Sequence, residues 1–310
     1  MSWLSSALPS SISFLNLNTR RANLRTIAEP PPIDAAPAPI FDFSGTALQT
    51  DYPDTIGKRY YVKIIDNVFS LDECEALVRF AETGIFESGD NSGQRERDGD
   101  GGEDSADWQP VVIRTNSRYG HQAGHALDAL YRNSDRILRF SSSVASWVFD
   151  RLQPHISELV EIRPNTEWEK VVGKPMPGVP GGGGEVWRLV GVNERLSFLR
   201  YGKGMSFKEH CDSHVTVRDS EGSGARCGRV TIQIYLTSPG SEVVREPSRV
   251  EGGSTRLWSK DMKRHVDVEP KPGRVLVFQH RGVLHSGEEV LEGTKYTLRS
   301  DLMFRSKRVT

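Results

Sequence analysis

Two histidines and an aspartate in the last third of the chain have the residue types and spacing of a metal site. His210 and Asp212 are two residues apart, so on an extended strand both side chains point to the same face and can hold one ion together. A third ligand must come from another strand, and His285 stands just after the apolar run RVLVF. Two imidazoles and one carboxylate leave about three adjacent coordination positions open, which is the arrangement of a non-haem iron(II) oxygenase.

The spacing of His210 and Asp212 is weak evidence alone, because other histidines compete for the same roles. His265-Val-Asp267 repeats the pattern but runs directly into a Pro-Gly turn, which favours a polar pair on a solvent-facing strand. His280 competes with His285 as the third ligand. The context of each histidine therefore has to decide between them.

The elements that must position these residues are short strands. From Arg195 onward, apolar runs alternate with turns, and no long helix is predicted between them. The five strand candidates are LSFLRY (196–201), VTIQIYL (230–236), STRLW (254–258), RVLVF (274–278) and YTLRSDLMF (296–304). This pattern of short apolar runs separated by turns predicts a β-sandwich or barrel of the jelly-roll kind.

The preceding part of the chain predicts a strand and supporting helices. YYVKII (60–65) has the alternation of a strand, and Ser70 with Glu73 forms a capping box at the start of a helix that Gly84 ends. A second helical region is expected from about 123 to 152, bent near the serines at 141–143. We therefore expect an α+β, mainly β fold, with helical support in 58–190 outside a jelly-roll core in 195–305.

Three segments are predicted to lie outside this core. Residues 1–57 form a tail with a proline-rich linker (29–40), and the first 28 residues contain arginine and serine but no acid. We expect a disordered tail and a cytoplasmic protein; a mitochondrial transit peptide is the alternative reading of that composition. The acidic, glycine-rich stretch 88–107 and the Gly/Pro-rich stretch 173–184 are predicted loops.

The composition excludes little and suggests a soluble globular protein. Hydrophobic residues make up 36% of the chain and charged residues 26%, with a formal net charge of -1. Neither nucleic acid nor membrane is expected as a partner, because no basic excess and no apolar run of about 20 residues occurs. The three cysteines contain no CxxC pair, which is typical of a reducing compartment.

The motifs around the histidines resemble a known family in sequence order as well as in ligands. They are LRYGKGMSFKEHCD (199–212), GRVTIQIYL (228–236), EGGSTRLW (251–258), PKPGRVLVFQH (270–280) and LHSGEEVLEGTKYTLRSDLMF (284–304). Together they resemble the catalytic domain of the prolyl 4-hydroxylase alpha-subunit-like branch of the Fe(II)/2-oxoglutarate-dependent dioxygenases. The resemblance is strong over the last 110 residues and looser over 60–190.

The resemblance implies a role for individual residues. The family's H-x-D ligands fall on His210 and Asp212, and its distal histidine, followed by x-Gly, falls on His285. The basic residue that pairs with the far carboxylate of 2-oxoglutarate falls on Lys295, with Arg299 on the same strand face as the alternative. Tyr235 is the implied hydrogen-bond donor to that carboxylate, and Tyr201 the implied wall of the cosubstrate pocket.

The implied cofactors are Fe(II), 2-oxoglutarate as cosubstrate and O2, with ascorbate as a candidate addition. The implied reaction is hydroxylation coupled to decarboxylation of 2-oxoglutarate to succinate and CO2. For the substrate we hypothesise a peptidyl proline. The alternatives are a free small molecule, such as an amino acid or natural-product intermediate, and a jelly-roll binding module without turnover. Arg114 to Arg118 is a candidate substrate segment.

Overall fold

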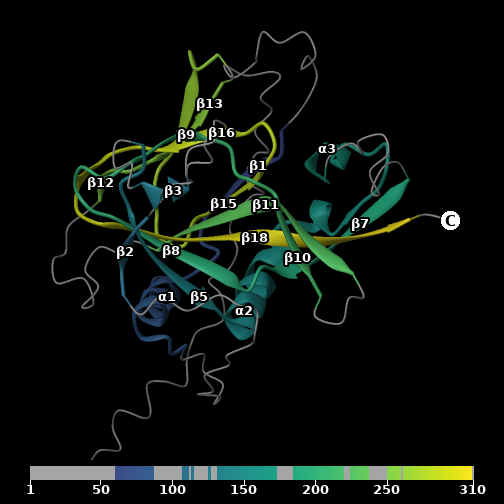
Figure 1. The fold of residues 1–310 in the computed structure, drawn as a ribbon, viewed down its shortest axis with the longest axis horizontal. Coiled ribbons are helices and arrows are strands. Elements are labelled where there is room, and N and C mark those ends of the chain that lie inside the picture. Colours follow the sequence, from purple (N-terminus) through teal and green to yellow (C-terminus); the bar gives the residue numbers. More distant parts are fainter. Residues whose placement is uncertain are drawn as a thin grey trace, which may run out of the picture.

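A computed structural model describes residues 60–86, 107–111, 113–114, 125–126, 131–172, 184–219, 224–236, 250–259 and 261–308. Within them, a large antiparallel sheet lies between helices on one side and a smaller sheet on the other (Figure 1). The main path of the large sheet is β1 (Val62–Ile65), β15 (Val275–Gln279), β11 (Ala225–Tyr235), β18 (Lys295–Arg308), β8 (Arg195–Tyr201), β5 (Asp135–Phe140) and β2 (Gln109–Pro110). Three more strands join it, namely β10 (Val215–Arg218) beside β11, β7 (Glu185–Val192) beside β18, and β6 (Glu161–Ile162) beside β7.

The smaller sheet carries four strands in spatial order. They are β14 (His265–Val268), β13 (Thr255–Trp258), β16 (Leu284–Gly287) and β9 (Phe207–His210). Two further strand pairs are β12 (Glu251–Gly252) with β17 (Val290–Glu292), and β3 (Ile113–Arg114) with β4 (His125–Ala126). The expected mainly β fold with a jelly-roll core is confirmed. In the part of the chain that the structure describes, no helix is long and apolar enough to cross a membrane.

The first predicted helix is confirmed, including both of its ends. Helix α1 (Leu71–Thr83) begins at a capping box in which Ser70 accepts from the Glu73 amide and Glu73 accepts from the Ser70 amide. It ends at Gly84, which adopts φ 70°, a left-handed conformation that glycine reaches without strain. The capping signal in the sequence therefore fixed the helix boundaries correctly.

Among the described residues of the predicted helical region 123–152, only α2 (Ser142–Leu152), capped by Ser141, is an α-helix. The prediction is wrong for 135–140, which form strand β5. Ile137 and Arg139 are buried and their neighbours are less so, which is a period of two rather than 3.6. Pairing with β8 along its full length stabilises this strand. The predicted loops 88–107 and 173–184 lie, except for Asp107 and Gly184, outside the described residues.

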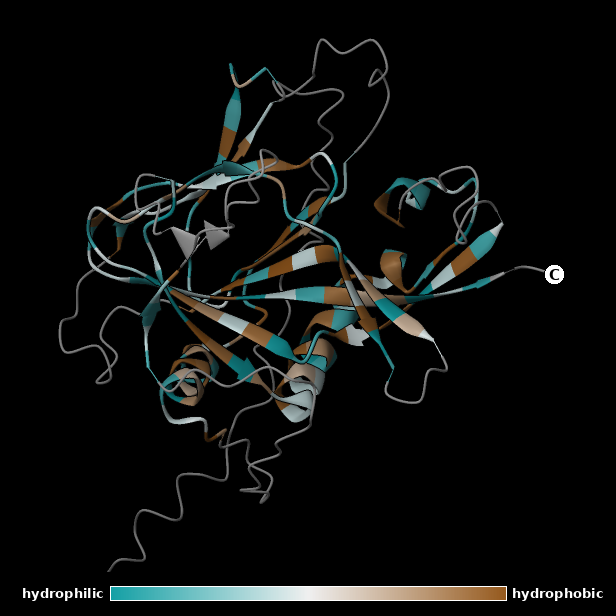
Figure 2. Cartoon of the chain, in the orientation of Figure 1, coloured by the Kyte–Doolittle hydropathy of each residue, from teal (hydrophilic) through white to brown (hydrophobic). Residues whose placement is uncertain are grey.

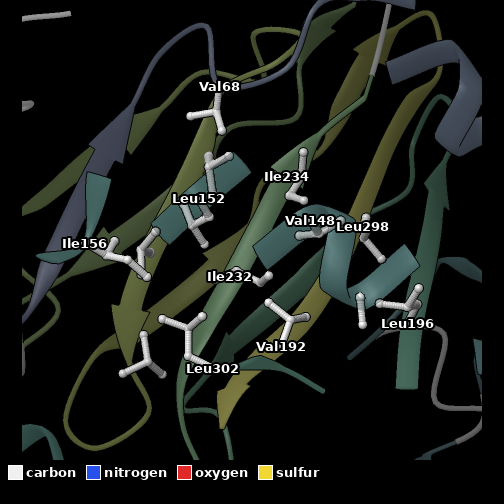
Figure 3. Close-up of a cluster of buried hydrophobic side chains, with 14 of the residues drawn as sticks. Val68, Val148, Leu152, Ile156, Val192, Leu196, Ile232, Ile234, Leu298 and Leu302 are labelled. Atoms are coloured by element: carbon white, nitrogen blue, oxygen red, sulfur yellow. The ribbon is translucent and has the colours of Figure 1, made fainter. Parts of the chain in front are cut away.

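The core lies between the large sheet and the helices. Apolar and polar residues alternate along the strands of the large sheet (Figure 2), so each strand has one face for the core. Figure 3 shows Val148 and Leu152 of α2 packed toward Ile232 of β11 and Leu298 of β18. The remaining helical elements are α3 (Glu169–Val172) and two 3-10 turns, η3 (Gln153–His155) and η4 (Ser157–Leu159), and buried residues of α3 and η4 belong to the same core cluster. The opposite face of the same strands points toward the smaller sheet and carries the polar residues of the site.

Candidate active site

The three predicted metal ligands come together between the two sheets. His210 ends β9, and the strand register places it directly opposite His285 on β16, with 4.2 Å between the ring centroids. Nε2 of His210 lies 4.0 Å from Oδ1 of Asp212. One donor atom from each residue lies within 4.8 Å of the other two, so the group can hold a single metal ion. It is the one such cluster found among the described residues.

Both imidazoles are oriented by backbone carbonyls two residues before them. Nδ1 of His210 lies 2.8 Å from the Lys208 carbonyl, and Nδ1 of His285 lies 3.2 Å from the Val283 carbonyl. A proton on each Nδ1 satisfies these contacts and leaves each Nε2 lone pair for a metal. Burial lowers the pKa of both histidines, that of His210 to about 4. Both rings are therefore neutral near pH 7, as metal ligands must be.

The carboxylate of Asp212 uses its two oxygens differently. Oδ2 accepts a hydrogen bond from the Thr231 hydroxyl at 2.5 Å and lies 3.2 Å from Nη2 of Arg299. Burial alone would raise the pKa of Asp212, but the charges of Arg299 and His285 and the hydrogen bond from Thr231 hold it well below its usual range. The aspartate is ionised, and Oδ1, on the side of His210, is left for a metal.

A buried ionic chain continues behind Asp212. Nη2 of Arg299 lies 3.2 Å from Oδ1 of Asp301, which in turn lies 3.2 Å from Nε2 of the fully buried His280. His280 is therefore placed against Asp301 and outside the cluster of three donors. The roles of Thr231 and Asp301 were not predicted. Their positions on the polar face of their strands, in step with Arg299, were the available signal.

Lys295 is buried in the same cavity without a carboxylate partner among the described residues. Its side chain is 1% exposed, Nζ donates to the Gly253 carbonyl at 2.6 Å, and it lies 4.6 Å from the centre of the Tyr201 ring. Burial lowers the pKa of Lys295 to about 8, against a smaller opposing effect of Glu288. The ammonium group is thus held in the cavity by a neutral carbonyl and an aromatic face.

The two predicted tyrosines occupy different places. Tyr201 lines the cavity, as expected for a wall of the cosubstrate pocket. Tyr235 is fully buried, and its hydroxyl donates to Oγ1 of Thr255 at 2.7 Å. Gln233 Nε2 donates to the same oxygen at 2.8 Å, and it is Thr255 that lines the cavity. Direct contact between Tyr235 and the cosubstrate therefore stays a prediction.

The cavity itself has a volume of about 340 Å³ and receives residues from both sheets. The large sheet contributes polar side chains of β8 and β18, and the smaller sheet contributes the ligand histidines. Arg132, Arg136 and Arg195 also line it, and no motif in the sequence groups them.

The competing H-x-D pair lies elsewhere, on β14. His265 is exposed, and both oxygens of Asp267 accept hydrogen bonds from Arg256, at 2.7 and 2.8 Å. An exposed pair whose carboxylate is already neutralised is a surface feature. The candidate substrate segment 114–118 lies almost wholly outside the described residues.

Comparisons with known proteins find one family model that matches the part of the chain holding this site. Residues 196–300 match the sequence model of the 2OG-Fe(II) oxygenase superfamily, a range that contains all three ligands and both Lys295 and Arg299. No curated protein matches the chain.

Three similar solved structures have low identity. A prolyl-4-hydroxylase from Pseudomonas putida is 16% identical, with 83% of this chain and 97% of that chain covered and a TM-score of 0.43. The viral collagen prolyl hydroxylase of Paramecium Bursaria Chlorella virus-1 is 15% identical, with 78% and 96% covered and a TM-score of 0.39. A 2OG-Fe(II) oxygenase-family oxidoreductase from Burkholderia pseudomallei is 10% identical, with 78% and 84% covered and a TM-score of 0.38.

Proposed function

We propose that the chain is a dioxygenase of the 2OG-Fe(II) oxygenase superfamily, whose sequence model matches residues 196–300, and that it hydroxylates a C–H bond of its substrate. In the same reaction 2-oxoglutarate is decarboxylated to succinate and CO2. One atom of O2 enters succinate and the other enters the substrate, so the reaction balances without another reductant. The observation that carries the proposal is the convergence of His210, Asp212 and His285 in one cavity with a buried, unneutralised lysine.

The donor set fits iron(II). Two neutral imidazoles and one carboxylate suit a divalent iron with open coordination positions. An iron ion held by these residues would be chelated by the 2-oxo acid end of 2-oxoglutarate and would supply the activation of dioxygen. The protein residues around it fix the donors. The Phe207 ring stacks on His210 at 3.7 Å, and the Phe278 ring meets His285 edge-on at 4.7 Å, which keeps water from both imidazoles.

We propose Lys295 as the anchor of the far carboxylate of 2-oxoglutarate. Arg299 is on the same strand face, but its guanidinium already contacts Asp212 and Asp301. Lys295 has a carbonyl and a ring as neighbours, so its charge is available to an incoming carboxylate. Arg299 would then act on Asp212, by holding Oδ2 so that Oδ1 faces the metal.

For the substrate we propose two candidates for testing. A peptidyl proline is the first, on the resemblance of the sequence motifs. A free small molecule is the second, and the cavity of about 340 Å³ supports it because this is the size of a small-molecule site. Ascorbate belongs in the assays, since it can return oxidised iron to the ferrous state.

The test is an anaerobic titration with Fe(II) and 2-oxoglutarate, followed by exposure to 18O2 and analysis of succinate and product. His210→Ala should abolish succinate release, because it removes a metal ligand. His265→Ala is the matched control: it changes the exposed histidine of the other H-x-D pair and should keep wild-type turnover. Undiminished succinate release by His210→Ala would contradict the proposal. Binding of iron and 2-oxoglutarate without any succinate would indicate a binding module.

A further inference from the structure

Three arginines line the cavity without a role in the proposed reaction. Arg136 lies on β5 and Arg195 on β8, which are neighbouring strands, and Arg132 forms a bridge to Phe207 of β9. All three are half-buried. Arg132 and Arg136 are close in the sequence, and the pairing of β5 with β8 brings Arg195 to the same cavity.

These guanidinium groups lack carboxylate partners among the described residues. Arg132 Nε donates to the neutral Ser134 hydroxyl at 3.1 Å. Burial and the positive charges of Arg195 and Arg132 lower the pKa of Arg136 to about 10. The negative charge of Asp301 acts to raise the pKa of Arg195, but Asp301 is already paired with Arg299. Like charges gathered away from water raise the free energy of the empty protein, which is typical of a site built for a charged ligand.

Loading the proposed cofactors does not neutralise the arginines. The charges of iron(II), Lys295 and Arg299 are matched by those of 2-oxoglutarate, Asp212 and Asp301. Among the described residues, Asp212 is the one acidic residue that lines the cavity, and it is already paired with Arg299. The excess positive charge therefore remains for a further anion.

Arg195 lies far from Lys295. Lys295 pairs with Tyr201 at one end of β8, and Arg195 is at the other end of that strand, about 20 Å along it at roughly 3.3 Å per residue. Arg132 lies beside the metal site instead, since its guanidinium is 4.3 Å from the centre of the Phe207 ring, which stacks on the ligand His210. An anion on Arg195 and the nearby Arg136 would be distinct from the 2-oxoglutarate carboxylate.

We propose that the substrate is a small organic acid whose carboxylate or phosphate group binds Arg136 and Arg195. The inference rests on the proposed function and adds the chemical class of its substrate. Guanidinium groups offer paired N–H donors that match the oxygens of either anion. His210 and Asp212 line the same cavity as these arginines, so a small molecule held by its anion would reach the proposed metal ligands.

The first experiment measures anion binding with inorganic phosphate and acetate as the probes. Each is titrated by NMR against the full-length protein, alone and with Mn(II) and saturating 2-oxoglutarate under anaerobic conditions. Arg136→Gln and Arg195→Gln should each weaken the affinity for the preferred probe about 10-fold or more. Arg188→Gln is the matched control, because Arg188 is an exposed arginine of β7 paired with Glu161, and it should bind as the wild type does. The probe that binds more tightly indicates whether the substrate carries a carboxylate or a phosphate group.

The second experiment follows succinate release with matched pairs of small carboxylic acids and their amides. Acids should stimulate the wild type more than their amides do, and Arg136→Gln should lose this preference. Arg136→Lys keeps the charge without the paired donors and tests the same point if the glutamine variant folds poorly.

Equal probe binding by the wild type and both glutamine variants would overturn the inference. So would stimulation by an uncharged proline-rich peptide that Arg136→Gln leaves unchanged. Anion binding that depends on the arginines, in a protein that binds neither Mn(II) nor 2-oxoglutarate, would contradict the proposed function and leave the anion site standing.

Discussion

Replacing Lys295 by methionine should separate binding of 2-oxoglutarate from stability of the fold. Methionine keeps an unbranched side chain of similar length and removes the charge. A charge-assisted hydrogen bond contributes about 1.5–3 kcal/mol, so the dissociation constant for 2-oxoglutarate should rise about 10- to 150-fold. Affinity for the metal should stay as in the wild type, because Lys295 touches none of the three ligands.

The same change should leave the stability of the ligand-free protein nearly unaltered. Burial lowers the pKa of Lys295 from 10.5 to about 8, which corresponds to about 3 kcal/mol against the charged form near neutral pH. The variant removes this penalty. It also leaves the Gly253 carbonyl without its donor, which costs about 1–3 kcal/mol. The two effects nearly cancel, so the net change should lie between zero and about 2 kcal/mol of added stability.

Thermal denaturation with Mn(II), with and without 2-oxoglutarate, measures both quantities. At a ligand concentration of about 100 times the wild-type Kd, 2-oxoglutarate stabilises the wild type by about 2.7 kcal/mol. A variant that binds about 100-fold more weakly gains only about 0.4 kcal/mol. Lys203→Met, at an exposed lysine paired with Glu292, is the control and should keep the full shift. A full shift in Lys295→Met would refute the assignment and point to another anchor for the carboxylate.

Three further outcomes follow from the same contacts. Only the ammonium form of Lys295 attracts a carboxylate, so the affinity for 2-oxoglutarate should be constant below pH 8 and fall about tenfold per pH unit above it. The affinity of Lys295→Met should not change with pH. Titration calorimetry across this range measures whether the affinity falls as the pH rises. Gly253→Ala should lower the free energy of unfolding by about 1–2 kcal/mol, because alanine is strained at a φ of +66°. It should also weaken 2-oxoglutarate binding, because the new Cβ would lie 3.3 Å from Cδ of Lys295. Gly184→Ala, at φ +82° with open space around it, should show the loss of stability without the loss of binding. Thr231→Val removes the hydroxyl that holds Asp212 and should weaken Fe(II) binding about 10- to 100-fold, whereas an unchanged iron titration would show that Arg299 alone suffices.

The sequence determined the local features because they depend on neighbours in the chain. The capping box at Ser70 and the glycine end of α1 follow from hydrogen bonds within one turn. The pairing of His210 with Asp212 on one face follows from the two-residue period of an extended strand. Residues 135–140 were misread as helix because apolar residues in so short a run fit both periods. Hydrogen bonding to β8 decided in favour of a strand.

Only the tertiary structure could assign the charged residues. Lys295 and Arg299 share one strand face, so their sequence positions cannot show which of the two charges is neutralised. In the structure, Lys295 contacts a backbone carbonyl and Arg299 contacts two aspartates, so Arg299 is the neutralised residue. His280 and His285 are separated in the same way, since one meets Asp301 and the other lies opposite His210. These choices depend on strand register and on the distance between sheets, which bring together residues far apart in the chain. Coulomb interactions and burial act across that distance and leave no periodic signal in the sequence.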